Sequence, residues 1–80
     1  MYYVYILKSK IDNSRYVGTT ADLKRRLQEH NSGSSRYCSS KCPYRLIWYC
    51  IFTDKKKAYR FELYLKSSSG YAFTKKHLIT

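Results

Sequence analysis

The first strand-like segment, Tyr2–Lys8, constrains the fold more than any other part of the chain. Its apolar residues form two interleaved sets, which are Tyr3, Tyr5 and Leu7 on one face and Tyr2, Val4 and Ile6 on the other. Successive side chains of a strand point to opposite faces, so both faces of this strand are apolar. A strand of this kind needs a covering layer on each side. We therefore expect it to be the central strand of a sheet.

The following segment predicts a hairpin. Lys10–Ser14 carries an Asp-Asn turn, and Arg15–Thr19 follows as a second strand, with Gly18 indicating a bulge or a close backbone approach. Tyr5 and Tyr16 lie on the two adjacent strands and are expected to meet across the hairpin. A phenol is a poor base at neutral pH, but nearby positive charge would favour its phenolate. Because the chain has ten tyrosines, sheet packing is the ordinary alternative for both residues.

Turn residues divide the second half of the chain into three further elements. Tyr44–Thr53 is nearly all apolar and predicts a third strand. Asp54 is the expected cap of a helix from Lys55 to about Ser67, residues 68–70 break the chain, and Tyr71–Ile79 forms a short basic helix. The order β-β-α-β-α-α predicts an α+β fold, with a three-stranded antiparallel sheet flanked by about three helices. The 80 residues are expected to form a single domain, 1–80.

The helix predicted after the hairpin carries two polar residues on its apolar face. Thr20 is the expected N-cap, with Asp22 in the first turn, and the helix is expected to end near Asn31, at Ser32-Gly33. Helical spacing places four residues on one face, which are Leu23, Arg26, Leu27 and His30. Arg26 has the planar fork of donors that stabilises charge on a phosphate, and the imidazole of His30 can relay a proton. The ordinary alternatives are a surface arginine and a histidine that contacts the C-terminal helix dipole.

A carboxylate lies on the apolar stripe of the second predicted helix. Ala58, Phe61 and Leu65 define that stripe, and Glu62 falls on it. A carboxylate in such a place costs several kcal/mol unless it is paired or bound to a cation. One interpretation is a buried ion pair with Arg26 or another base. The other is a metal ligand, because a hard divalent ion takes one or two carboxylates and fills its other positions with water and phosphate oxygens.

The charge of the chain favours a polyanionic partner. Sixteen Lys and Arg residues against five Asp and Glu residues give a net charge of +11. Such an excess on a small domain points first to nucleic acid, although a basic protein without such a partner remains the alternative. No run approaches the roughly 20 apolar residues of a membrane span. The N-terminal segment reads as a strand and not as a signal peptide, so we expect a cytoplasmic protein.

The cysteines argue against a disulfide framework. Their number is odd, and they are Cys38, Cys42 and Cys50. A structural zinc site would need Cys38 and Cys42, which have C-x3-C spacing, and further ligands from among Cys50, His30 and His77, the only other candidates. Reduced thiols are therefore the expected state of the cysteines.

Four basic residues are the expected contacts to nucleic acid. The Ser-rich loop SSRYCSSKC, residues 34–42, is the best candidate for a segment that meets a ligand, and it contains Arg36 and Lys41. Lys24 and Arg25 are expected to face solvent on the first helix, next to Arg26.

Four short segments resemble the GIY-YIG nuclease domain, and the resemblance extends over essentially the whole chain. They are Tyr3-Val4-Tyr5 in place of the GIY tripeptide, Tyr16-Val17-Gly18 in place of YIG, the Asp22–Asn31 helix, and Phe61–Lys66 around the glutamate. The similarity is greatest to the small stand-alone bacterial members, which resemble the nuclease subunit of nucleotide excision repair. Two positions depart from the pattern. Tyr3 stands in the glycine position of the first motif, and Thr19 stands where the repair subunit has a lysine.

The resemblance implies a metal-dependent endonuclease that hydrolyses DNA phosphodiester bonds. One divalent ion, Mg²⁺ or Mn²⁺, would be held by Glu62, while Arg26 stabilises charge on the phosphate and His30 assists proton transfer. A tyrosine would activate the attacking water, with Tyr5 preferred and Tyr16 as its hydrogen-bonding neighbour. The resemblance also implies selectivity for DNA structure, a role in repair or recombination, and a protein partner that supplies specificity. The sequence leaves the oligomeric state open.

A non-catalytic nucleic-acid-binding or recruitment module on the same fold is the alternative. In such a module the basic face binds and the cleft is idle. The set of Tyr5, Tyr16, Arg26, His30 and Glu62 favours the enzyme, because binding alone does not need a carboxylate in a basic cleft.

Overall fold

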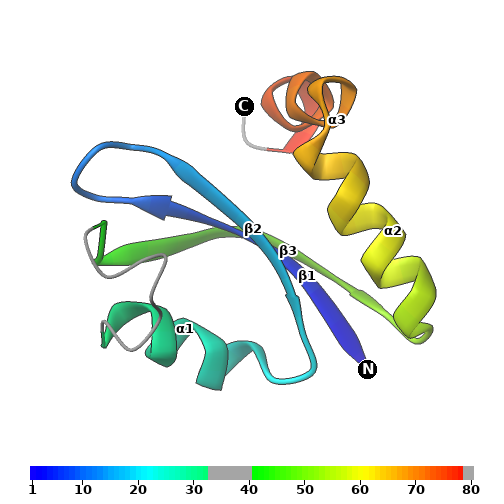
Figure 1. Cartoon of the computed structure of the whole chain (residues 1–80), viewed down its shortest axis with the longest axis horizontal. Helices are drawn as coiled ribbons and strands as arrows, with labels where there is room; N and C mark the ends of the chain where they lie inside the picture. Colours follow the sequence, from blue (N-terminus) through cyan, green and yellow to red (C-terminus); the bar gives the residue numbers. More distant parts are fainter. Residues whose placement is uncertain (33–40, 79–80) are drawn as a thin grey trace.

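The predicted order of elements is confirmed in the computed structural model, which describes residues 1–32 and 41–78 (Figure 1). The strands are β1 (Tyr2–Ser9), β2 (Arg15–Thr20) and β3 (Tyr44–Phe52). The helices are α1 (Leu23–Asn31), α2 (Lys55–Lys66) and α3 (Ser68–Phe73), and a π-helical turn, η1 (Thr74–Leu78), continues α3.

The strand β1 is the centre of the sheet. The three strands lie in the order β2-β1-β3, and both neighbours pair antiparallel with β1. Tyr5 lies opposite Gly18 of β2 and Tyr49 of β3. The pairing with β3 is irregular between Ile6 and Leu7, where β3 contains one additional residue. The prediction of a central strand is confirmed, and β2 and β3 are the two edges.

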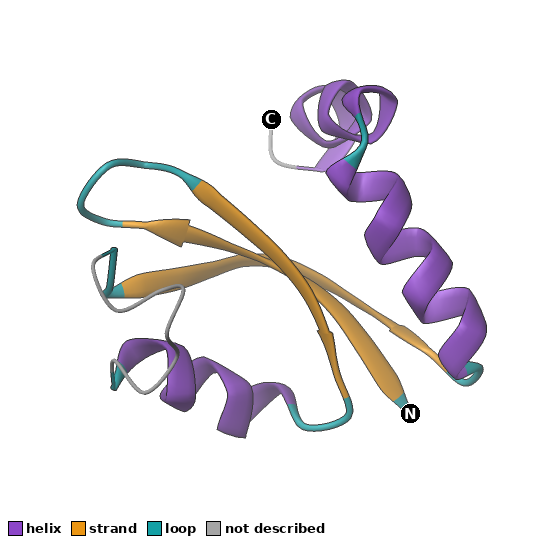
Figure 2. Ribbon diagram, in the orientation of Figure 1, coloured by secondary structure: helices purple, strands orange, loops and turns teal. Residues whose placement is uncertain are grey.

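Each face of the sheet has its own core. Val4 and Ile6 pack with Ala58 and Leu65 under α2. On the opposite face Tyr5, Leu7 and Tyr44 are buried, with α1 beside them. Figure 2 shows α1 on one side of the sheet and α2 and α3 on the other. The two-sided apolar pattern of β1 therefore places one helical layer on each face, with β1 buried between them.

The N-terminus of α1 lies two residues later than the sequence predicted. Asp22, and not Thr20, is the N-cap, because its carboxylate accepts a hydrogen bond from the backbone N–H of Arg25 at 3.1 Å. The Thr20 hydroxyl accepts instead from the N–H of Asp22 at 3.1 Å. Thr20 is still paired with β1, so it ends β2 and cannot begin the helix.

The helix α3 begins at Ser68, so the prediction of a break over residues 68–70 was wrong. The Ser67 hydroxyl accepts a hydrogen bond from the N–H of Gly70 at 3.1 Å, which makes Ser67 the N-cap. A Cβ atom on Gly70 would lie 1.8 Å from the backbone oxygen of Tyr64. The Ser-Ser-Gly segment therefore lets α3 follow α2 after a tight corner, where the sequence indicated a loop.

Several predictions lie outside the described residues. They are the helix stop at Gly33, most of the Ser-rich loop with Arg36 and Cys38, and the end of the last helix at Ile79. Within residues 1–32 and 41–78, no helix is long and apolar enough to cross a membrane.

Candidate active site

Gly18 creates the space in which the Tyr5 ring lies. The two residues are direct partners across the hairpin. A Cβ atom on Gly18 would lie 2.4 Å from the Tyr5 hydroxyl oxygen, 2.6 Å from its Cζ and 3.1 Å from Cε1 of Tyr16. Real Cβ contacts essentially never fall below 3.0 Å. The predicted close approach at Gly18 is therefore explained by the phenol of Tyr5, which extends across the backbone of β2.

The histidine of α1 packs among tyrosines. His30 is buried, and its Nε2 lies 3.2 Å from the Tyr5 hydroxyl oxygen. The ring centroids of His30 and Tyr16 are 4.6 Å apart in an edge-to-face arrangement, and Tyr44 lies on a further side at 5.9 Å. Although His30 is in the last turn of α1, it does more than contact the helix dipole, because it links α1 to the two hairpin tyrosines.

Burial keeps both members of the Tyr5–His30 hydrogen bond neutral near pH 7. Desolvation raises the pKa of Tyr5 to about 12, against the opposing effect of a hydrogen bond from Arg26. Desolvation likewise lowers the pKa of His30, and the charge of Arg26 lowers it further. The neutral phenol and the neutral imidazole can each donate or accept, so the His30 tautomer sets the direction of the bond.

Arg26 brings a cation to the two tyrosine hydroxyls. Its pKa is raised, chiefly by the hydrogen bond to Tyr5, with Tyr16 adding a weaker one. One terminal nitrogen, Nη1, also lies 3.6 Å from the Glu29 carboxylate. The Nε atom of Arg26 is buried and has no hydrogen-bond partner among the described residues. An unpaired buried donor costs about 1–3 kcal/mol, so this N–H marks a place where an oxygen of a ligand would be stabilised.

Glu62 is buried by α2 and is already paired. Its side chain is 10% exposed, and the hydroxyl of Thr19 donates to Oε1. The ammonium of Lys66, one turn later on α2, donates to Oε2 at 2.6 Å. The expected ion pair is therefore made with Lys66 and not with Arg26. The i,i+4 spacing of Glu62 and Lys66 was the sequence signal that would have revealed this partner.

The two groups of residues meet at the edge strand β2. Tyr5, Arg26 and His30 belong to the face covered by α1, whereas Glu62 belongs to the face covered by α2. The charge of Glu62 nevertheless contributes to the raised pKa of Tyr5, so the carboxylate is within electrostatic reach of the phenol. A cavity of about 290 Å³ opens beside Glu62 and Thr19. The carboxylate of Glu62 is thus within electrostatic reach of Tyr5, although the cavity beside it is not lined by Tyr5, Tyr16, Arg26 or His30.

The oxygen atoms available as metal ligands at this edge of the sheet suit a hard divalent ion better than they suit zinc. Glu62 supplies carboxylate oxygens and Thr19 a hydroxyl beside an open cavity. Among the described residues no three His, Cys, Asp or Glu side chains are grouped as metal ligands. An ion such as Mg²⁺ keeps several waters and takes phosphate oxygens, so one protein carboxylate is sufficient.

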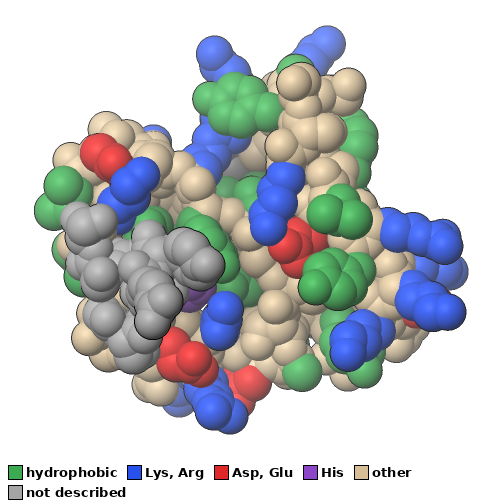
Figure 3. Space-filling model, viewed as in Figure 1, with side chains coloured by type: hydrophobic (Ala, Val, Ile, Leu, Met, Phe, Trp, Pro, Cys, Tyr) green, Lys and Arg blue, Asp and Glu red, His purple; other side chains and the backbone are tan. Residues whose placement is uncertain are grey.

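The predicted nucleic-acid contacts have different surroundings. Lys24 and Arg25 are exposed on α1, and Arg25 pairs with Glu29 at 3.3 Å. Lys41 pairs with Asp12 of the hairpin turn at 3.5 Å, and Arg36 lies outside the described residues. Lys and Arg side chains project from several parts of the face in Figure 3. The structure therefore leaves α1 as the described basic surface nearest to Arg26.

Residues 1–76 match the family model described as the GIY-YIG catalytic domain. The chain therefore belongs to the GIY-YIG family, a nuclease family whose members generally use divalent metals and bind DNA.

The relatives of the chain are small bacterial UPF0213 proteins. A UPF0213 protein of Clostridium perfringens is 40% identical over 67 residues, which are 82% of this chain and 71% of the relative. A UPF0213 protein of Halalkalibacterium halodurans is 41% identical over 69 residues, or 85% of this chain and 72% of the relative. The solution NMR structure of the UPF0213 protein from Bacillus halodurans superimposes with a TM-score of 0.61 at 35% identity, covering 99% of this chain and 87% of that one. These similarities confirm the predicted family and fold.

Proposed function

We propose that the protein is a metal-dependent endonuclease that hydrolyses phosphodiester bonds of DNA. The observation that carries the proposal is the position of Glu62, a buried carboxylate beside an open cavity and within electrostatic reach of Tyr5, which hydrogen-bonds His30 and Arg26. A packed core has no need of a buried carboxylate on one face of the edge strand and a buried arginine Nε–H without a partner among the described residues on the other. The net charge of +11 supports a DNA substrate.

Arg26 binds the phosphate that is cut. Its buried Nε–H lacks a protein partner among the described residues, while the rest of the guanidinium is held by Tyr5, Tyr16 and Glu29. A fixed donor of this kind stabilises the negative charge that develops on the phosphate oxygens, and loss of such a donor typically costs about 10²–10³ in rate. Lysine would not replace this arginine well, because it lacks the planar fork.

In this proposal Tyr16 acts as a phenolate and takes the proton of the attacking water, whose oxygen bonds to phosphorus as the bond from phosphorus to the leaving oxygen breaks. The sequence favoured Tyr5, but Tyr5 is buried and its pKa is raised to about 12. Tyr16 is half-buried and borders open space, so water can reach its hydroxyl. Tyr5 then positions the other members of the cluster through its contacts with Arg26 and His30. His30 assists by taking up or releasing a proton at Nε2.

Glu62 holds the divalent ion, Mg²⁺ or Mn²⁺. When bound, the ion supplies positive charge beside the phosphate and the leaving group. The Lys66 ammonium must first leave Oε2, and its side chain is 49% exposed, so solvent can receive it. A bound ion would then replace Lys66 as the positive partner of the buried carboxylate, so Glu62 would not be left unpaired.

A non-catalytic nucleic-acid-binding or recruitment module is the second candidate. The observation in its favour is the same Lys66–Glu62 pair, which satisfies the carboxylate without any metal. In that case Arg26 and the basic surface of α1 bind DNA, and no bond is cut.

Cleavage of defined DNA substrates tests the proposal. Branched, flapped and duplex DNA are incubated with Mg²⁺ or Mn²⁺, because the resemblance points to repair or recombination. Glu62→Gln is expected to lower the cleavage rate at least about 100-fold, since the ion loses its carboxylate. Asp54→Asn is the matched control, because it removes one exposed negative charge at the start of α2, and asparagine caps a helix about as well as aspartate does.

Each outcome separates the two candidates. Undiminished cleavage by Glu62→Gln contradicts the assignment of Glu62 as the metal ligand. Absence of cleavage on every substrate, together with salt-sensitive binding, supports the binding module instead.

A further inference from the structure

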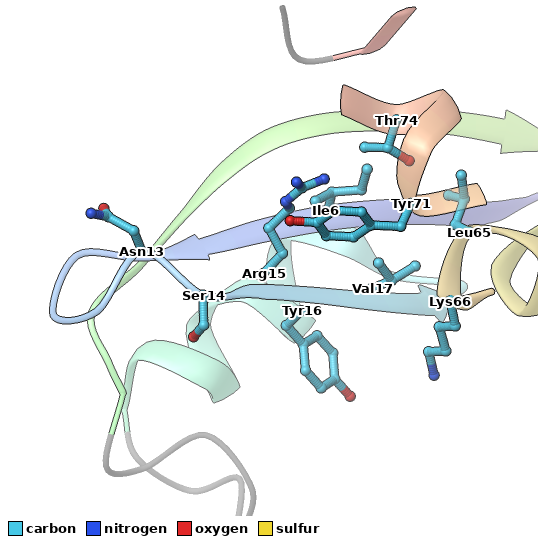
Figure 4. A pocket seen from close by; sticks show the side chains of 10 residues that line it. All are labelled: Ile6, Asn13, Ser14, Arg15, Tyr16, Val17, Leu65, Lys66, Tyr71 and Thr74. Carbon is cyan, nitrogen blue, oxygen red and sulfur yellow. The ribbon is translucent and has the colours of Figure 1, made fainter. Parts of the chain in front are cut away.

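A second hollow, of about 530 Å³, lies beside β2 and outside the Glu62 cavity. We name it the β2 groove, and the residues used below are Arg15, Tyr16, Lys66 and Tyr71. It extends from the hairpin turn to the C-terminal end of α2 and the start of α3 (Figure 4). Tyr16 lines the groove and packs against His30, and Lys66 lines the groove and pairs with Glu62, so the groove adjoins the candidate active site.

An aromatic ring is held in place at the wall of the β2 groove. The side chain of Tyr71 is 56% exposed, although it is large and apolar. The guanidinium carbon of Arg15 lies 4.1 Å from the centroid of the Tyr71 ring. Figure 4 shows the two side chains lying against each other within the groove. This cation–π contact fixes the ring while leaving much of it open to solvent.

The β2 groove has the charge of a polyanion site. Among the described residues that line it, Arg15 and Lys66 are cationic, and none is acidic. Lys66 has a partner in Glu62, but it would be released if a cation occupied that carboxylate. An exposed aromatic ring and two cations in one groove match a strand of nucleic acid, in which bases alternate with phosphates.

We propose that the β2 groove binds the unpaired DNA strand next to the bond that is cut. A base stacks on Tyr71, and the adjacent phosphates contact Arg15 and Lys66. The inference rests on the proposed function and narrows its substrate class to DNA with a single-stranded flank, such as a flap. A base within a duplex has both faces covered by its neighbours, whereas an unpaired base offers a face for stacking. The volume of about 530 Å³ lies within the roughly 300–1,000 Å³ typical of small-ligand sites.

The position of the β2 groove gives the bound strand a direction. Because Tyr16 also packs against His30 and Lys66 also pairs with Glu62, a strand that leaves the active site enters the groove at these two residues. It would then follow the outer edge of β2 toward the hairpin turn. The groove therefore binds nucleotides on one side only of the scissile phosphate.

Binding measured without divalent metal tests the inference separately from cleavage. Fluorescence anisotropy is recorded with a labelled oligothymidylate of about ten nucleotides and with a duplex of the same length, in EDTA. Tyr71→Ala is expected to weaken single-strand binding about tenfold, which is about 1.4 kcal/mol. Tyr71→Phe keeps the aromatic face and is expected to bind as the wild type does.

Tyr49→Ala is the matched control for the loss of an exposed tyrosine. Tyr49 is 50% exposed on β3, the edge strand opposite to β2. Its replacement is expected to change neither affinity by more than about twofold. The inference is overturned if Tyr71→Ala behaves like this control, or if it weakens duplex and single-strand binding equally.

A titration of the wild-type protein provides a second measurement that needs no variant. The backbone amides of Arg15 and Tyr71 are expected to show large NMR shift changes on addition of the oligothymidylate. Changes confined to α1 would overturn the inference. If DNA is cleaved but Tyr71 is irrelevant, the inference fails and the proposed function stands. If Tyr71-dependent binding occurs without any cleavage, the proposed function fails and the groove assignment stands.

Discussion

Replacing Gly18 with alanine tests whether the tyrosine cluster depends on one missing side chain. The new Cβ would lie 2.4 Å from the Tyr5 hydroxyl oxygen and 2.6 Å from its Cζ, so the ring must move. The ring has little room, because Tyr5 is buried and its hydroxyl is hydrogen-bonded to His30 at 3.2 Å. We therefore expect Gly18→Ala to destabilise the fold and to disturb the site at the same time.

The cost of Gly18→Ala follows from three contributions. Forcing a methyl group into a packed site costs about 1–3 kcal/mol. Weakening the buried Tyr5–His30 hydrogen bond adds about 1 kcal/mol. The lower backbone entropy of alanine in the unfolded chain offsets about 0.4–1 kcal/mol. The free energy of unfolding should therefore fall by about 2 kcal/mol, which lowers the Tm by roughly 8–16 °C for a domain of this size.

Urea denaturation of four variants measures this coupling. They are the wild type, Gly18→Ala, Tyr5→Phe and the double variant. Because Tyr5→Phe removes the atom closest to the new methyl group, Gly18→Ala should cost about 1 kcal/mol less in the Tyr5→Phe background. The reasoning is refuted if Gly18→Ala is neutral or stabilising, or if its cost is the same in both backgrounds.

Two further predictions concern the charged partners of the site. Lys66→Met removes the ammonium from the Oε2 atom of Glu62, so the variant is expected to bind Mn²⁺ several-fold more tightly in calorimetry. Unchanged or weaker Mn²⁺ binding would contradict the proposal that a metal ion replaces Lys66 at Glu62. For His30, the pKa is lowered in the folded protein from 6.5, so the unfolded chain takes up a proton that the folded one excludes. The free energy of unfolding should therefore fall as the pH drops below about 6.5, and His30→Gln should remove this component of the pH dependence. Equal pH profiles for His30→Gln and the wild type in urea denaturation would contradict the assigned shift.

The features of the structure that depend on local residue spacing were predicted correctly. The central position of β1 followed from its two apolar faces, and the burial of Glu62 followed from its place on the stripe of Ala58 and Leu65. Asp54 was also identified as the cap of α2, where it accepts from the N–H of Lys56 at 2.8 Å. These features depend on side-chain periodicity and on capping within one element, which short segments of sequence encode.

The features that depend on which of several possible partners a side chain contacts were not predicted. Ser68 to Gly70 contain residues typical of loops, but the hydroxyl of Ser67 makes them the first turn of α3. The sequence offered Arg26 or another base as the partner of Glu62, and Lys66 is that partner because it lies one turn away on the same helix. The preference for Tyr5 over Tyr16 as the base remains untested, but burial now favours Tyr16 as the tyrosine in contact with water.

The sequence by itself determined the order of the elements, the two-sided sheet and the candidate site residues, because periodicity and side-chain type are local properties. The tertiary structure decided which of those residues meet. The hairpin pairing places Gly18 beneath Tyr5, the packing of α1 brings His30 and Arg26 to the tyrosines, and the turn after α2 sets Tyr71 against Arg15. Each of these contacts joins elements that are distant in the chain. Their geometry depends on how two helical layers cover the opposite faces of one sheet, and that arrangement exists only once the whole chain has packed.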